Sequence, residues 1–204
     1  MKVNEIFLSI QGEGPEMGQP AVFVRLSGCN LKCDFCDSRY ADTGIIMSVF
    51  DVEKEIKSYG CEKVIITGGE PLLQTEEVKK LFYLLVDSHI ISLETNGTIY
   101  TDLPFRLISV SPKRQHLNMP ILGHYAKQNN IIFKFVKEEG IVNWWEPLIA
   151  KLQIPAKKVW IMPEGKTRKK QLQKMEDVWE YCSDRGFNFS PRLHVLTYDD
   201  KRGV

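Results

Sequence analysis

The sequence predicts an α/β protein whose parallel strands form an incomplete (β/α)6-type, TIM-like barrel within a single domain spanning residues 1–204. Six short, almost wholly apolar runs alternate with amphipathic segments, a pattern typical of parallel sheets covered on both faces. A doubly wound sheet would satisfy this pattern equally well. The barrel is favoured because polar or glycine-rich residues follow strand after strand, and in barrels such strand ends meet at one mouth.

The expected strands are the apolar runs, and each is short enough to be a buried strand. They cover residues 21–28, 63–67, 90–94, 107–111, 131–136 and 158–162. Between and after them, helical periodicity predicts helices at residues 48–60, 75–88, 143–152 and 169–186. Ser48 and Thr75 are candidate N-caps, and Gly60 and Gly186 are candidate helix ends.

Composition and charge exclude several classes of partner. The 204 residues are 43% hydrophobic and carry 27 basic and 26 acidic side chains, a formal net charge of +1. Such a balance gives no global field for nucleic acid or an anionic membrane. Neither a secretion signal nor an apolar run of roughly 18 residues is present, so we expect a cytoplasmic protein.

Three of the five cysteines lie in "GCNLKCDFCD", residues 28–37. An odd total without a secretion signal argues against a disulfide framework, and the isolated Cys61 and Cys182 are expected to be small core residues. Soft thiolates select zinc, copper(I) or iron–sulfur clusters, and structural zinc and an ordinary cubane each need four protein ligands. Three thiols therefore leave one metal position open. Zinc completed by a distant histidine is the alternative, although no histidine lies at zinc-finger spacing.

The segment "GCNLKCDFC", with an aromatic residue before its last cysteine, resembles the signature of the radical S-adenosylmethionine (SAM) superfamily, as does "TGGEP" at residues 67–71. The resemblance implies that Cys29, Cys33 and Cys36 hold a 4Fe-4S cluster whose fourth iron is chelated by SAM. It also implies the superfamily's incomplete barrel. Phe35 would pack near the adenine of SAM, and Asp37 would supply backbone contacts.

A narrower resemblance spans nearly the whole chain. The segments "SIQGEG", "FVRLSGCN", "CDS", "SPK" and "SPRLHVLTYDDKRGV" are similar to those of 7-carboxy-7-deazaguanine synthases of the queuosine and 7-deazapurine pathway. Members convert 6-carboxy-5,6,7,8-tetrahydropterin to 7-carboxy-7-deazaguanine with loss of ammonia, need Mg²⁺ and are usually homodimers. The implied reaction abstracts hydrogen from C6, contracts the ring and reforms SAM. A flavodoxin or a ferredoxin would supply the electron.

The resemblance assigns further SAM contacts residue by residue. The strand end after residue 67 would meet the methionyl amine, because glycines allow close approach and a carboxylate suits an ammonium. A second acidic residue would accept from the ribose hydroxyls, and a Ser-Pro-Lys segment would face the carboxylate of SAM. These residues are Gly68, Gly69, Glu70, Glu94, Ser111 and Lys113.

The substrate contacts follow in the same way. Arg25, inside an apolar strand, suits a bidentate grip on the pterin carboxylate. The loop Gln11, Gly12 and Glu13 would read the donor and acceptor edge of the pterin, and Thr67 and His194 would also touch the substrate.

The hydroxyl of Ser38 would ligate Mg²⁺, a hard cation that prefers oxygen. In known relatives the chain ends a few residues after the histidine matching His194, and its terminal carboxylate can reach the pterin. Here ten residues follow His194, so a matching role for Val204 stays open.

Two rival functions remain at this point. An activating enzyme for a glycyl-radical protein shares the cysteine triplet, but it has no obvious use for "SIQGEG", Arg25 or "SPRLH". A zinc-stabilised binding module without chemistry is the more distant rival.

Overall fold

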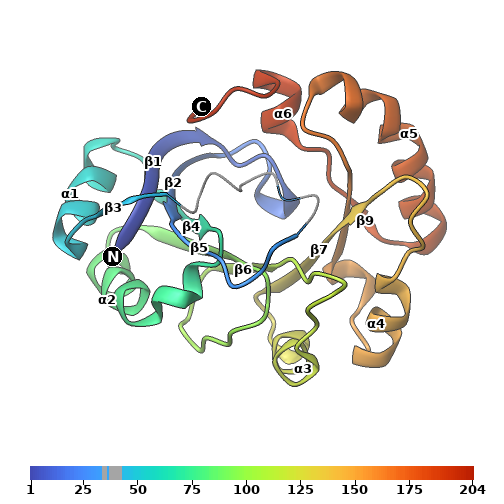
Figure 1. Ribbon diagram of the computed structural model, residues 1–204, viewed down its shortest axis with the longest axis horizontal. Helices are drawn as coiled ribbons and strands as arrows, with labels where there is room; N and C mark the ends of the chain where they lie inside the picture. Colours follow the sequence, from blue (N-terminus) through green and yellow to red (C-terminus); the bar gives the residue numbers. More distant parts are fainter. Residues whose placement is uncertain (34–35, 37–42) are drawn as a thin grey trace.

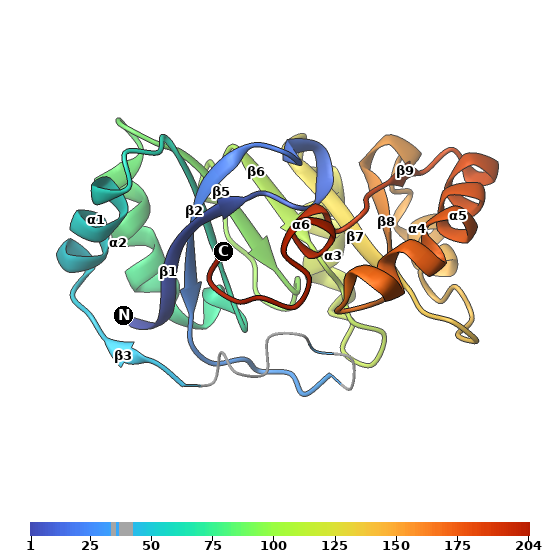
Figure 2. The same ribbon diagram turned by 90° about the horizontal axis from the view of Figure 1, so that it is seen from above.

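The computed structural model describes residues 1–33, 36 and 43–204, and its centre is one curved sheet. The strand order is β3-β1-β2-β4-β5-β6-β7-β8-β9. Figure 1 shows helices α1 to α5 on the outside of this curve, and Figure 2 shows α1 and α2 at one end of the molecule with α4 and α5 at the other.

All six strands expected from the sequence are present and run parallel to one another. They are β2 Pro20–Leu26, β4 Lys63–Gly68, β5 Ile90–Thr95, β6 Leu107–Val110, β7 Ile131–Lys137 and β8 Val159–Pro163. The short β9, Asn188–Phe189, extends the parallel sheet beyond β8. At the other edge, β1 (Lys2–Ile10) pairs antiparallel with β2, and β3 (Ile45–Ile46) pairs antiparallel with β1.

Helices connect most of the parallel strands. They are α1 Val49–Ser58, α2 Thr75–Leu85, α3 Met119–Lys127, α4 Trp145–Leu152 and α5 Arg168–Arg185, and α6 Leu193–Tyr198 follows β9. In the part of the chain that the structure describes, 3-10 helices occupy loops at η1 Gly14–Glu16, η3 Pro71–Gln74 and η4 Ala156–Lys158. Residues 96–106, all described, join β5 to β6 without a helix. The (β/α) repeat is thus shortened at one crossover.

The caps explain where the helices begin and end. The Ser48 hydroxyl accepts from the Asp51 amide at 3.1 Å, and Gly186 ends α5 with a φ of 66°. Thr75 differs from its expected role as an N-cap, because η3 runs directly into α2 and makes Thr75 the first helical residue. Its hydroxyl instead donates to the Leu72 carbonyl.

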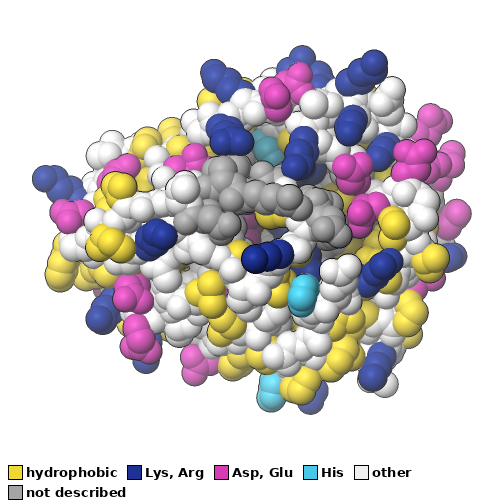
Figure 3. Space-filling view, in the orientation of Figure 1, with side chains coloured by type: hydrophobic (Ala, Val, Ile, Leu, Met, Phe, Trp, Pro, Cys, Tyr) yellow, Lys and Arg dark blue, Asp and Glu magenta, His cyan; other side chains and the backbone are white. Residues whose placement is uncertain are grey.

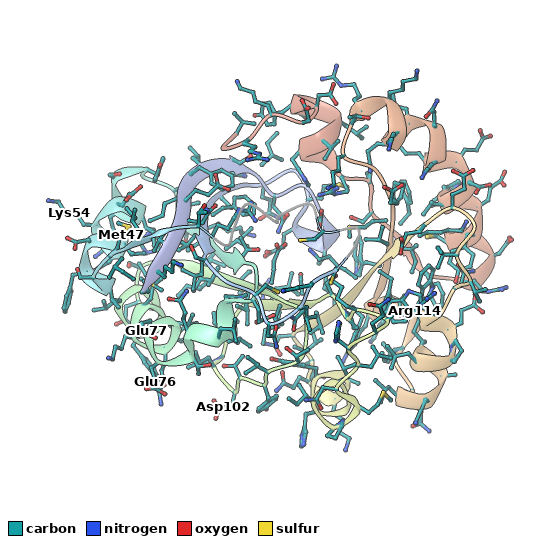
Figure 4. The ribbon with its side chains drawn as sticks, viewed as in Figure 1. Met47, Lys54, Glu76, Glu77, Asp102 and Arg114 are labelled. Atoms are coloured by element: carbon teal, nitrogen blue, oxygen red, sulfur yellow. The ribbon has the colours of Figure 1, made fainter. Side chains whose placement is uncertain are left out.

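The main core lies between the outer face of the sheet and the helices. Strand residues such as Val64 and Leu93 pack there against the apolar faces of the helices, including Ile56 and Phe82. Cys182 is buried in this core and Cys61 packs against it half-buried, as expected for small apolar residues. The opposite helix faces are polar, and Figure 4 shows Lys54 and Glu76 pointing outward from α1 and α2.

A second, smaller cluster fills the inside of the curve. Ala21, Phe23 and Ile65 pack there with Phe7, whose ring is stacked on Phe23 at a centroid distance of 5.3 Å. These residues precede the polar residues near the C-terminal ends of their strands. The barrel interior is therefore filled with apolar side chains below the C-terminal ends of the parallel strands, and it is lined with polar side chains at those ends.

The sheet does not close into a complete barrel. In the described part of the chain, β3 and β9 are its two edges. The expected α/β fold, an incomplete TIM-like barrel, is confirmed. No helix among the described residues is long and apolar enough to span a bilayer.

Candidate functional site

A cavity of about 930 Å³ lies inside the curve of the sheet, at the C-terminal ends of the parallel strands. Alternate residues of a strand face the same side, so the inward positions of each strand contribute to one wall. The inward-facing residues among the lining are Phe7, Ser9, Gln11, Phe23, Arg25, Thr67, Glu94, Ser109, Ser111, Lys134, Val136 and Met162. Strand ends separated in sequence therefore share one cavity.

The three clustered cysteines line this cavity. Cys29, Cys33 and Cys36 are half-buried and form no disulfide. The Cys36 amide donates to the Cys33 carbonyl at 3.2 Å, and Lys166 Nζ donates to the Cys36 carbonyl at 3.0 Å. Within the described residues, no three Cys, His, Asp or Glu side chains are already gathered as a metal site. Three thiols on one cavity wall fit the donor set of an iron–sulfur cluster with one open position.

The glycines after β4 lie tightly against the start of the cysteine loop. The Gly69 amide donates to the Leu26 carbonyl at 3.2 Å, and the Glu70 amide donates to the Gly28 carbonyl at 2.9 Å. A Cβ on Gly68, whose φ is 150°, would lie 2.2 Å from the Leu26 carbonyl oxygen. Glycine is required here because the two backbones touch. Gly68 and Gly69 both line the cavity.

Glu70 lies beneath that turn and does not line the cavity. Its carboxylate accepts from the Leu72 amide at 3.0 Å and the Asn96 amide at 2.7 Å, and from the Thr95 hydroxyl. Burial raises the pKa of the Glu70 carboxyl, and these hydrogen bonds oppose the rise. This placement differs from the expected side-chain contact with the methionyl amine, because the surrounding donors turn the carboxylate toward the interior.

A chain of charged side chains crosses the cavity. Lys134 Nζ donates to Glu13 Oε2 at 2.8 Å and to Glu94 Oε1 at 2.9 Å. The Thr67 hydroxyl donates to Glu94 Oε2 at 3.0 Å. Burial alone would lower the pKa of Lys134, but the two carboxylates raise it, so the ammonium stays charged.

Glu13 is the most strongly perturbed acid in this set. Burial would raise the pKa of Glu13, but Lys134, Arg192 and His194 together hold it far below the ordinary value. Arg192 Nε contacts Glu13 Oε1 at 3.0 Å. The neighbouring Gln11 is buried, and its amide oxygen accepts from the Glu13 backbone amide at 3.1 Å. The loop therefore presents an ionised carboxylate to the cavity.

Arg25 also lines the cavity and has a partner within the protein. Its Nε lies 2.6 Å from Glu5 Oε1, and its guanidinium carbon lies 5.7 Å from the centroid of the Phe7 ring. An irregularity in the pairing of β1 with β2 between Val3 and Glu5 places Glu5 opposite Arg25. The arginine charge is thus neutralised by β1 even without a ligand, which the sequence did not lead us to expect.

His194 lies against the loop that carries Gly12. A Cβ on Gly12 would lie 1.9 Å from His194 Nδ1, so only glycine fits. The Leu193 amide donates to the Gly12 carbonyl at 2.9 Å and fixes α6 beside that loop. On the other side of the cavity, Lys113 Nζ donates to the Ser111 hydroxyl at 2.8 Å. Gly12, His194, Ser111 and Lys113 all line the same cavity.

Residues 199–204 complete the lining. After α6 the chain runs back toward β1, as Figures 1 and 2 show from two directions. Val204 is among the lining residues. On the surface, Figure 3 shows basic and acidic side chains interspersed, in agreement with the near-zero net charge.

Comparison with known proteins identifies the family. Residues 23–117 match the radical SAM superfamily. A 7-carboxy-7-deazaguanine synthase from Halobacterium salinarum is 35% identical over 98% of this chain and 91% of the relative. A synthase of the same name from Hyperthermus butylicus is 38% identical over 96% of this chain and 92% of the relative.

The chain belongs to the 7-carboxy-7-deazaguanine synthase family. The crystal structure of QueE from Escherichia coli agrees, with a TM-score of 0.71, 25% identity and coverage of 95% of this chain and 94% of that one. The chain is accordingly a radical SAM enzyme, a lyase, and its family implies a 4Fe-4S cluster and SAM as cofactors.

Most of the site residues predicted from the sequence of this synthase lie close together in the structure. Fourteen of them line one cavity: Gln11, Gly12, Glu13, Arg25, Cys29, Cys33, Cys36, Thr67, Gly68, Gly69, Glu94, Ser111, Lys113 and His194. Phe35, Asp37 and Ser38 lie outside the described residues. Their proposed roles toward SAM and Mg²⁺ therefore stay predictions.

Sequence reasoning missed Glu5, Lys134 and Arg192. Lys134 carried a usable signal, because a lysine inside the otherwise apolar run "IIFKFV" must face a polar interior or a partner. Arg192 lies in the quoted segment "SPRLH" but received no role. Glu5 gave no signal of its own, because its pairing depends on the irregular register of β1.

Proposed function

We propose that this enzyme converts 6-carboxy-5,6,7,8-tetrahydropterin to 7-carboxy-7-deazaguanine with loss of ammonia, by hydrogen abstraction at C6 and ring contraction. One observation carries the proposal. The loop at residues 11–13, Arg25 and the segment around His194 border the same cavity as the three cysteines. An activator of a glycyl-radical protein would have no use for these polar groups next to its cluster.

Cys29, Cys33 and Cys36 would hold the 4Fe-4S cluster, and Gly68 and Gly69 would let the methionyl end of SAM approach the backbone. The bound cluster and SAM supply the one-electron chemistry. Glu94 would accept from the ribose, and Ser111 with Lys113 would face the carboxylate of SAM. Phe35 and Asp37 would complete this site. Glu70 would act through its hold on the turn rather than by direct contact.

For the substrate, Arg25 would bind the pterin carboxylate and Glu13 would accept from the pterin N–H groups. Gln11, Thr67 and His194 would fix the orientation of the ring. Glu5 and Phe7 support this assignment, since they hold the Arg25 guanidinium in one place before substrate arrives. The chain's contribution is to position the pterin and exclude water.

Three further features are proposed from the family resemblance. Mg²⁺ would bind the Ser38 hydroxyl and the substrate carboxylate, because it prefers oxygen ligands. A flavodoxin or a ferredoxin would reduce the cluster. The enzyme would work as a homodimer in the cytoplasm.

The experiment is an anaerobic reaction of the reconstituted protein with carboxytetrahydropterin, SAM, Mg²⁺ and a reductant, followed by mass analysis. We expect 7-carboxy-7-deazaguanine and ammonia. Cleavage of SAM without any deazaguanine would overturn the substrate assignment and favour the glycyl-radical alternative.

The cluster assignment is checked separately by the visible spectrum. Cys29→Ala, Cys33→Ala and Cys36→Ala should each lose the iron–sulfur absorption, and Cys61→Ala should keep it, because Cys61 packs against the core. A wild-type spectrum in any of the first three variants would contradict the ligand set.

A further inference from the structure

Lys134 is a charged side chain in the middle of the otherwise apolar strand β7. Its side chain is 4% exposed and reaches two carboxylates, Glu13 from the loop after β1 and Glu94 from β5. Each carboxylate uses its second oxygen elsewhere: Glu13 contacts Arg192 and Glu94 accepts from Thr67. Within this network the charges of two acids are balanced by those of two bases.

The two carboxylates serve different ligands, if the proposed function holds. Glu13 faces the pterin and Glu94 faces the ribose of SAM. Lys134 is bonded to both, although the loop of Glu13 and the strand of Glu94 are about 80 residues apart in the sequence. An ammonium this deeply buried cannot leave one carboxylate without leaving a poorly solvated charge. A displacement of the Glu94 carboxylate therefore displaces the Lys134 ammonium, and with it the Glu13 carboxylate.

We propose that Lys134 is a positioning residue that couples the SAM site to the substrate site. A ligand that orients Glu94 fixes the ammonium, and the ammonium in turn fixes Glu13 for the pterin. The second ligand then meets a carboxylate that is already ordered. Because such coupling is reciprocal, SAM tightens pterin binding by the same factor as the pterin tightens SAM binding.

The test uses the anaerobic, cluster-loaded enzyme without reductant, so that both ligands bind and neither reacts. Titration calorimetry gives the dissociation constant of each ligand alone and with the other at saturation. For wild type we expect each ligand to tighten the other by about fivefold or more. In Lys134→Met the ratio should fall to about one, and the cluster spectrum should be unchanged.

Lys137→Met is the matched control. Lys137 is on the same strand but faces the helices, where its Nζ lies 3.5 Å from Asp177 and 5.8 Å from the centroid of the Tyr181 ring. This variant should keep the wild-type ratio. Should Lys134→Met fail to fold, Glu94→Gln replaces it, since the amide keeps the shape and removes the charge at the SAM end. Its coupling ratio should also fall to about one.

Coupling retained in Lys134→Met, or in its replacement, would overturn the proposal and indicate direct contact between the ligands. A wild-type ratio of one would also overturn it. Failure of the proposed function is distinguishable, because then the carboxytetrahydropterin would not bind wild-type enzyme at all.

Discussion

At residue 25 a guanidinium lies between the Glu5 carboxylate and the Phe7 ring. A guanidinium carries five N–H donors in a planar fork, and this geometry matches that of a ligand carboxylate. We expect Arg25→Ala to weaken carboxytetrahydropterin binding by roughly 2 to 5 kcal/mol, and Arg25→Lys not to restore it. Calorimetry on the cluster-loaded enzyme measures both.

The control for this prediction is Arg106→Ala. Arg106 is exposed just before β6, at the opposite end of the strands, and should leave the affinity unchanged. SAM binding should survive both arginine substitutions. Wild-type affinity for the pterin in Arg25→Ala would require a different residue to bind its carboxylate.

Glu13 gives the site a pH dependence. Lys134, Arg192 and His194 hold the pKa of Glu13 below its ordinary value of 4.5 despite burial. A depressed folded pKa contributes stability that is present above pH 4.5 and is lost as the pH falls below it. We therefore expect wild type to lose stability on acidification to a greater extent than Glu13→Gln. Thermal unfolding followed from pH 6 down to about pH 2.5 measures this, and parallel curves below pH 4.5 would contradict the assignment.

At the scale of elements, α6 packs against the loop after β1 through a close contact between His194 and Gly12. Ala at position 12 would place a Cβ 2.8 Å from the His194 backbone nitrogen, so α6 would have to move away. We expect Gly12→Ala to lose at least about tenfold in pterin affinity, which corresponds to about 1.4 kcal/mol, while SAM still binds. Calorimetry with each ligand separates the two effects.

Gly123→Ala is the matched control for that substitution. In α3, a Cβ on Gly123 would make only an ordinary contact, 3.8 Å from Leu152 Cδ2. Alanine is favoured over glycine within a helix by about 1 kcal/mol, so this variant should bind both ligands normally and unfold at a slightly higher temperature. Normal pterin binding in Gly12→Ala would show that α6 is free to shift.

The elements recovered from the sequence are those with strong local signals. The six expected strands are almost wholly apolar runs, and α1 and α5 have clear caps at Ser48 and Gly186, whereas the two-residue parallel strand β9 gives no such signal. β1 was missed because Asn4 and Glu5 interrupt its apolar pattern. Helix α6 is only six residues long and is fixed by tertiary contacts such as that of Leu193 with Gly12, which no local pattern reveals.

At the scale of the whole molecule, the cavity is assembled from segments far apart in the chain. The cavity is bordered by residues 11–13, by the cysteine loop, by six of the parallel strands and by parts of the segment 192–204. Motif resemblance was sufficient to name most of these residues. Motif resemblance did not predict the pairing of Glu13 with Lys134 and Arg192, because this pairing depends on how the strands curve toward one another. Glu70 likewise lies behind the wall rather than on it.

The central claim is that this cavity holds the pterin with its C6 directed at SAM. The most direct measurement is the anaerobic reaction with carboxytetrahydropterin that carries deuterium at C6, with mass analysis of both the product and the SAM. We predict 7-carboxy-7-deazaguanine together with deuterium in the recovered SAM. Deazaguanine formed without any deuterium in SAM or in 5'-deoxyadenosine would contradict hydrogen abstraction at C6, and absence of deazaguanine would contradict the proposed reaction itself.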